Sequence, residues 1–214
     1  MSNVRESSHI AGVHVVEPTI HGDQRGLFIE TYRREWFPNA REMLQGNRSN
    51  KQQGALVGLH YHLHQADYWY CPVGTIRVVL HDLRDGGPTA GATECFDISG
   101  DNPLGVYIPP GVAHGFAALS DCVMTYLVDG YYNPADELGV LWNDPVIGAD
   151  HPRLPCAGRS GSLCHQLIGP GNSRLAPRSE HCGPRRLFFF RFPFPECADR
   201  RRGIDGGVAS YGRR

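Results

Sequence analysis

The sequence predicts an all-β jelly-roll, a β-sandwich or barrel with few short helices and an irregular C-terminal tail. Many short segments are rich in β-branched and aromatic residues. Turns containing Gly, Pro, Asn or Asp separate these segments at roughly 8 to 12 residue intervals, which is typical of sandwiches and barrels. The 214 residues, of which 41% are hydrophobic and 20% charged, are enough for one globular domain with an appendage.

The expected strands follow one another along the first 132 residues. The first two, in VHVVEP and GLFIETY, are dominated by Val, Ile, Phe and Tyr, and the later ones repeat this composition between Gly and Asp turns. In order, the nine segments are 14–18, 26–32, 54–63, 67–73, 75–83, 92–98, 105–110, 115–120 and 122–132. Only residues 32–44 have helical character, and Pro38 interrupts them.

Charge divides the chain into two parts. Residues 1–152 hold 9 Lys and Arg against 18 Asp and Glu, whereas residues 153–214 hold 12 Arg against 4 acidic residues. We therefore expect a jelly-roll domain over 1–152. The tail, 153–214, is rich in Arg, Gly and Pro and should be poorly ordered. Arginine without a recognition fold is a weak sign of nucleic-acid binding, so nucleic acid is an unexpected partner.

Two further observations concern the cellular compartment. The sequence has no apolar run of 18 residues, and its first residues, MSNVRESSHIAG, lack the apolar stretch of a secretory signal. Its seven cysteines form no CxxC pair, and the odd number favours reduced thiols. We therefore expect a cytoplasmic protein with no membrane partner.

Histidines concentrate in the segment GALVGLHYHLHQADYWYCPVG, residues 54–74. Because side chains alternate along a strand, His60, His62 and His64 should point to one face. Buried imidazoles need a hydrogen bond, a counter-charge or a metal ion, so the pattern predicts either a proton-transfer site or a metal site.

The spacing G-x5-H-x-H-x4-D-x6-G resembles the first motif of metal-dependent cupins, with Asp67 in place of their usual Glu. Their second motif, P-x-G-x2-H, ends here at His114. One alternative is therefore a set of three histidines and one carboxylate for a single divalent metal such as Fe, Mn, Ni or Zn. Its members are His60, His62, Asp67 and His114.

Six stretches occur in an order that closely resembles the dTDP-4-dehydrorhamnose 3,5-epimerases: GDQRGLFIETY, GLHYH, LHDLRDGGPTAG, YIPPGVAHGFAALS, YLVDGYYNPADE and LWNDPVIG. The resemblance covers about residues 10–150. It implies a cupin jelly-roll that forms a homodimer, needs no cofactor and binds a dTDP-linked nucleotide sugar. The implied reaction epimerises a 4-keto-6-deoxyhexose by removing a proton next to the C4 ketone and returning one from the opposite face.

The resemblance also implies residue roles. The catalytic base falls on His60 and the catalytic acid on Tyr126. Substrate contacts fall on Arg25, Glu30, Gln45, Asn47, His114, Tyr132 and Glu137.

The sequence departs from the family pattern at four positions. Val57 stands where the family usually has Arg, His62 where it has Gln, Asp67 where it has Lys and Val78 where it has Asp. An impaired enzyme or one with an altered substrate therefore fits this sequence, as do a metal-dependent cupin isomerase or oxygenase and a non-catalytic sugar-nucleotide binding protein. A divalent cation could also replace the missing Lys as a Lewis acid.

Overall fold

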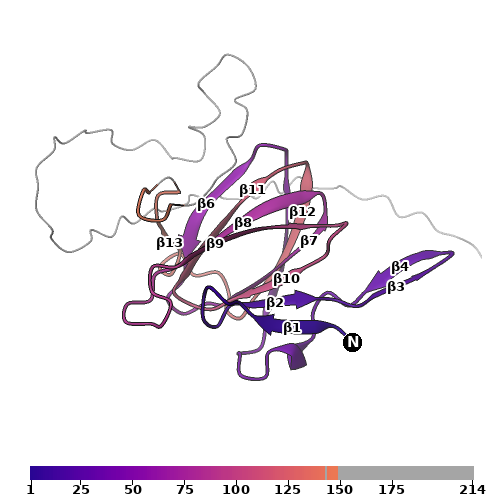
Figure 1. Cartoon of the computed structure of the whole chain (residues 1–214), viewed down its shortest axis with the longest axis horizontal. Coiled ribbons are helices and arrows are strands. Elements are labelled where there is room, and N and C mark those ends of the chain that lie inside the picture. Colours follow the sequence, from indigo (N-terminus) through magenta and orange to yellow (C-terminus); the bar gives the residue numbers. More distant parts are fainter. Residues whose placement is uncertain (143, 149–214) are drawn as a thin grey trace, which may run out of the picture.

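The computed structural model describes residues 1–142 and 144–148, so the predicted tail, residues 153–214, lies outside the described residues (Figure 1). The described chain contains strands, turns and one short 3-10 turn at Arg34–Trp36. Its strands are β1 (Asn3–Glu6), β2 (His14–Glu17), β3 (Ile20–Asp23), β4 (Gly26–Ile29), β5 (Gln45–Lys51), β6 (Leu56–Tyr61), β7 (Asp67–Val73), β8 (Thr75–Asp82), β9 (Thr93–Ser99), β10 (Gly105–Ile108), β11 (Val112–Ala118), β12 (Cys122–Val128) and β13 (Leu138–Gly139). The all-β prediction is confirmed.

Two antiparallel sheets form the body of the fold. The first has the order β1-β2-β10-β7-β12-β5 and the second the order β13-β6-β11-β8-β9. Strands that are distant in sequence pair in both sheets, as in a jelly-roll. Strands β3 and β4 pair only with each other, and this hairpin projects from the body (Figure 1).

The main core lies between the two sheets. Strand β8 shows how it forms, because Ile76, Val78 and Leu80 alternate inward and are fully buried. Val79, which points to the other face, belongs to a second apolar cluster. Strands β7, β10 and β12 supply the opposite side of the core. Since β7 and β8 are largely buried on both faces, they are nearly continuous apolar segments in the sequence.

A β-bulge interrupts the alternation along β6. Val57 packs against the core between the sheets, yet Leu59, two residues later, packs in the cluster on the other face. The register with β11 shifts accordingly, since Val57 pairs with Phe116 whereas His60 pairs with His114. The extra residue in β6 reverses the side of the sheet to which each later side chain of the strand points. The side chain of His60 therefore points into the sandwich.

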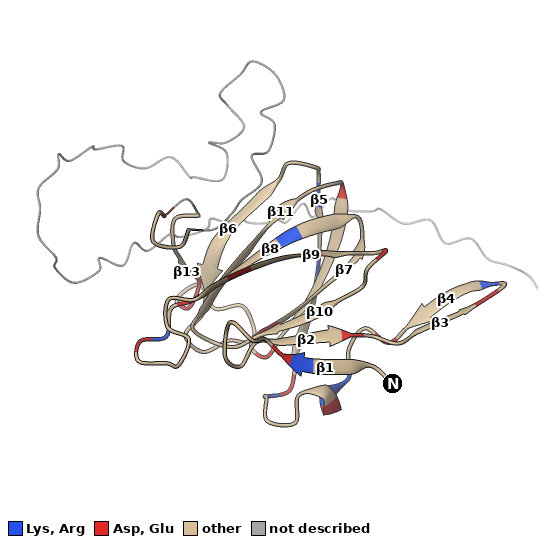
Figure 2. Ribbon diagram, viewed as in Figure 1, with Lys and Arg blue, Asp and Glu red and all other residues tan. Residues whose placement is uncertain are grey.

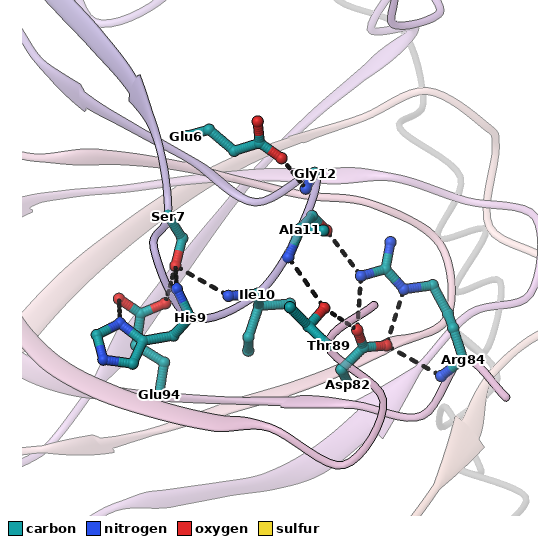
Figure 3. Close-up of polar contacts among 10 residues, drawn as sticks. All are labelled: Glu6, Ser7, His9, Ile10, Ala11, Gly12, Asp82, Arg84, Thr89 and Glu94. Atoms are coloured by element: carbon teal, nitrogen blue, oxygen red, sulfur yellow. Dashed lines mark hydrogen bonds and ion pairs between the residues drawn. The ribbon is translucent and has the colours of Figure 1, made fainter. Parts of the chain in front are cut away.

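A network of polar contacts fixes the segment 7–12 against the β8–β9 turn (Figure 3). The carboxylate of Asp82 accepts hydrogen bonds from Arg84 at 2.7 and 2.8 Å and from the Thr89 hydroxyl at 2.6 Å. Arg84 also donates to the carbonyl of Ala11 at 2.7 Å. Desolvation raises the pKa of Asp82, but the bonds from Arg84 and Thr89 outweigh it and lower this pKa to about 2.

The helical character of residues 32–44 is limited to one turn, because Pro38 interrupts it as expected. Only the 3-10 turn forms, and Phe37, the residue before Pro38, has φ −129° and ψ 68°, outside the helical region. A proline disfavours helical geometry in the preceding residue and donates no hydrogen bond of its own, which ends the turn.

Four strands were missed: β1, β3, β5 and β13. Within the described residues, no helix is long and apolar enough to cross a membrane.

Candidate functional site

Four polar side chains converge inside one end of the sandwich. His60 on β6 and His114 on β11 come from one sheet, Asp67 begins β7 in the other, and His62 follows β6. One ligand atom from each of the four lies within 4.8 Å of the others. His62, Asp67 and His114 are at most 4% exposed, whereas His60 is only partly buried. His60 is therefore the most exposed residue of this cluster.

The backbone at this point permits a close approach of β11 to β6. A Cβ at Gly115 would lie 2.6 Å from the carbonyl oxygen of Val57 and 3.1 Å from the backbone of Gly58. Only glycine fits at this distance. The His60 and His114 rings on these strands are in contact, with centroids 4.3 Å apart.

Two of the histidines have their orientation set by backbone carbonyls. Nδ1 of His62 lies 2.8 Å from the carbonyl oxygen of Asp136, and Nδ1 of His114 lies 2.8 Å from that of Val112. A carbonyl oxygen only accepts, so the proton of each neutral ring is on Nδ1. Each Nε2 therefore presents its lone pair to the cluster.

The electrostatics of the cluster keep the rings of His60 and His114 neutral at neutral pH. Burial lowers the pKa of His60 to about 3, and the neighbouring His114 adds to this effect. Burial and His62 likewise lower the pKa of His114 to about 3. The Asp67 carboxylate acts in the opposite direction and raises the pKa of His60. Asp67 is thus the counter-charge for any proton that His60 receives.

Tyr126 lies across the sandwich from His60. It is on β12, where it pairs with Trp69 of β7 on one side and with Asn47 of β5 on the other. The indole of Trp69 stacks on the His60 ring with centroids 6.4 Å apart. Gln45 lies on the same face of β5 as Asn47 and donates to its side-chain oxygen at 2.8 Å. The predicted acid and two predicted substrate contacts therefore share a wall that faces the predicted base.

Glu137, another predicted substrate contact, completes this group. Burial raises its pKa, as do Asp67 and Asp136, while His62 lowers it. Burial also raises the pKa of Tyr126, and Asp67 and Glu137 raise it further. The Tyr126 hydroxyl consequently stays protonated at neutral pH and is able to donate.

The structure does not bring the remaining predicted contacts to the cluster. Arg25 lies at the tip of the β3–β4 hairpin, where it forms an ion pair with Asp23, and Figure 2 shows both charges there, away from the sandwich. Glu30 follows the hairpin and pairs with Arg33 at 3.2 Å. Tyr132 lies on the loop after β12 and is 47% exposed.

The expectation that three histidines share one face holds for only two of them. Strand β6 ends at Tyr61, so strand alternation stops there, and His64 is exposed on the loop. The backbone N–H groups of Leu63 and His64 both donate to the Asp136 carboxylate, at 2.8 and 3.1 Å, which holds this loop in place.

Sequence reasoning missed three residues that position the cluster. The Asp67 oxygens accept hydrogen bonds from Gln65 at 2.9 Å and from the Trp69 indole at 3.1 Å. Asp136 holds the His62 ring from a position 74 residues away in the sequence. The available signal for Gln65 and Trp69 was their spacing, since each lies two residues from a carboxylate that needs donors when buried.

Known proteins of one family are similar to this chain. A family model described as dTDP-4-dehydrorhamnose 3,5-epimerase matches residues 7–163. A dTDP-4-dehydrorhamnose 3,5-epimerase of Neisseria gonorrhoeae is 38% identical over 146 residues, which make up 65% of this chain and 44% of that protein.

Two solved structures are similar over most of their length. The dTDP-6-deoxy-D-glucose-3,5-epimerase of Legionella pneumophila, in complex with dTDP-4-keto-L-rhamnose, has a TM-score of 0.67 at 32% identity, covering 71% of this chain and 84% of that chain. ChmJ, a 3′-monoepimerase of Streptomyces bikiniensis in complex with dTDP-quinovose, has a TM-score of 0.66 at 33% identity, covering 70% and 79%.

Proposed function

Because the chain belongs to the dTDP-4-dehydrorhamnose 3,5-epimerase family and is an isomerase of the epimerase type, we propose that it epimerises a dTDP-linked 4-keto-6-deoxyhexose at a carbon next to the C4 ketone. The observation that carries this proposal is the placement of His60 and Tyr126 on opposite sheets, facing one another across the end of the sandwich. Inversion requires a proton to leave one face of the sugar and another to arrive at the opposite face.

His60 is the base. Its ring is neutral at physiological pH, because burial lowers its pKa, and it is the one member of the cluster that is partly exposed. Taking a proton from carbon makes it an imidazolium, which the Asp67 carboxylate stabilises. Asp67 thus supplies the carboxylate beside the base, whereas Val78, where the family resemblance implied another Asp, is an apolar residue of the core.

Tyr126 is the acid. Its raised pKa keeps the hydroxyl protonated, so it can hydrogen-bond the enolate and then donate to the face opposite His60. Asn47 and Gln45, beside it on β5, are polar groups on the same wall for the hydroxyls of the sugar.

The relatives favour this function over the two alternatives, a metal-dependent cupin isomerase or oxygenase and a non-catalytic binding protein, since the proteins matched are epimerases.

Proton exchange tests this function directly. In D2O, metal-free full-length protein should catalyse the exchange of the proton on C3 or C5 of dTDP-4-keto-6-deoxyglucose for deuterium, as measured by NMR. His60→Gln should slow this exchange by a factor of about 100 or more. His64→Gln, which removes an exposed histidine from the same segment, is the control and should exchange at the unmodified rate. Full exchange by the His60 variant would show that this ring is not the base.

The predicted homodimer gains support from the β3–β4 hairpin. Leu27 is 68% exposed and Phe28 63% exposed, on a two-stranded element that projects from the body. An isolated hairpin is marginally stable, and exposed apolar groups of this kind mark contact surfaces. In this proposal the hairpin packs on a second copy of the chain, and Arg25 at its tip then reaches the substrate phosphates bound by that copy.

A cytoplasmic location is also part of the proposal. The buried thiols of Cys71 and Cys122 form no disulfide, as in a reducing compartment. Burial raises the pKa of Cys71 to about 11, so this thiol packs in the core and is not a nucleophile at neutral pH.

A further inference from the structure

The cluster in the sandwich has a property that proton transfer does not require. Three imidazoles and one carboxylate bring their ligand atoms within 4.8 Å of one another, and three of the four residues are buried. We propose that His60, His62, Asp67 and His114 form a binding site for one divalent transition-metal cation. The inference concerns binding by this chain and does not depend on the proposed epimerisation.

The first argument is an unpartnered nitrogen. Nε2 of His114 is buried and, within the described part of the chain, has no hydrogen-bond partner. The ring is 2% exposed, and its Nδ1 proton is already held by the Val112 carbonyl. A buried lone pair without a donor is costly, and few native groups are left in this state without a function. A metal cation can bind this lone pair directly, because the ring is already oriented by its Nδ1 hydrogen bond.

The second argument is the spacing of the ligand atoms. Nε2 of His62 lies 3.9 Å from one oxygen of Asp67, and Nε2 of His114 lies 3.7 Å from the other. These distances are too long for hydrogen bonds. Two ligands that each lie about 2.1 Å from one ion are roughly 3.0 to 3.4 Å apart. A contraction of a few tenths of an ångström in each of these two pairs would reach the upper end of that range.

The third argument is that the ligands are held from behind. Backbone carbonyls hold His62 and His114, while Gln65 and Trp69 donate to the two Asp67 oxygens. Such outer partners fix the tautomer and the ring orientation at metal sites. In the described part of the chain, the ion-pair contacts of Asp67 are with imidazoles. None of these contacts of Asp67 is with Lys or Arg, so the buried carboxylate has no fixed positive charge beside it within the described residues.

The donor set indicates the class of metal. Three imidazole nitrogens and one carboxylate oxygen suit Zn, Ni, Co, Mn or Fe(II) better than Mg or Ca, which prefer oxygen ligands. A cation held by all four groups would take the lone pair that His60 uses as a base, so bound metal and base catalysis exclude one another.

The test measures binding directly. Full-length protein without a polyhistidine tag is stripped with a chelator and titrated with Co2+, following the visible absorption of the bound ion, and with Zn2+ by calorimetry. We expect one cation per chain with imidazole and carboxylate ligation. His114→Gln and Asp67→Asn should each weaken this binding by about 100-fold or more.

Two further variants guard against misfolding and stray sites. His62→Gln removes a ligand without adding volume, and its circular dichroism should match that of the unmodified protein while its affinity falls. His64→Gln removes an exposed histidine two residues away and should bind as tightly as the unmodified chain. Binding below about a tenth of an equivalent, or equal affinity in the His114→Gln and Asp67→Asn variants, would overturn the proposal. Exchange by the metal-free protein tests the epimerase function separately.

Discussion

The Asp82→Asn substitution should destabilise the protein in a pH-dependent way. The hydrogen bonds from Arg84 and Thr89 lower the pKa of Asp82 from 3.8 to about 2, even though desolvation raises it (Figure 3). Since one pKa unit corresponds to about 1.4 kcal/mol, the ionised carboxylate contributes about 2 kcal/mol to the free energy of unfolding at pH 7. The segment 7–12, which carries the core residue Ile10, should separate from the β8–β9 turn more easily in the variant.

The sign of the pH dependence follows from the lowered pKa. The contribution of Asp82 is fully present above pH 3.8 and is lost as the pH falls through about 2, so about half of it remains at pH 3. Urea denaturation at pH 7 and at pH 3 measures this difference. Asp97→Asn is the matched control, because Asp97 forms a similar pair with Arg77 at 2.7 Å but is 41% exposed, and it should cost less than about 1 kcal/mol. Equal costs for the two variants, or a cost for Asp82→Asn that is the same at both pH values, would refute the reasoning.

Three further predictions concern the turn, the acid and the hairpin. Gly74→Ala should lower the midpoint of thermal unfolding, since φ is +79° and a Cβ would collide with the backbone of the facing turn; Gly91→Ala, at φ +80° with open space around it, should cost less. Tyr126→Phe should lower the rate of inversion by about 100-fold while deuterium still enters the substrate through the base, which NMR in D2O resolves. Replacing Leu27 and Phe28 together by serine should convert a dimer into a monomer in light scattering, and a dimer that persists would exclude the hairpin as its contact.

Strands were predictable where burial dictates their composition. Strand β7 was predicted at its observed bounds and β8 within one residue, because the core requires apolar side chains along both. Strand β5, QGNRSNK, was missed because it has no apolar alternation. Two of its residues, Gln45 and Asn47, pair with β12 beside Tyr126, and in the proposed function they are polar because they contact the sugar. The strand without a hydrophobic pattern is therefore the one that, in the proposed function, carries the polar contacts to the sugar.

The residues of the cluster could be predicted from the sequence, but the backbone geometry that brings them together could not. The spacing of the histidine motif indicated that His60, His62, Asp67 and His114 converge, and they do. With strict alternation along β6, His60 would lie on the face opposite to Val57 and would point away from the core. The bulge turns it inward. A bulge depends on the register with β11, which is a long-range property that local sequence patterns do not contain.

The residue at position 67 decides what kind of charge the site accepts. A lysine there, as in the family pattern, would stabilise negative charge on the enolate oxygen, whereas Asp67 repels it and raises the pKa of His60. The cluster thus accepts positive charge, either the proton that His60 takes from carbon or a metal cation. In the proposed function, stabilisation of the enolate then falls to Tyr126 on the opposite sheet. Burial, Asp67 and Glu137 all raise the pKa of its hydroxyl, which is a hydrogen-bond donor at neutral pH.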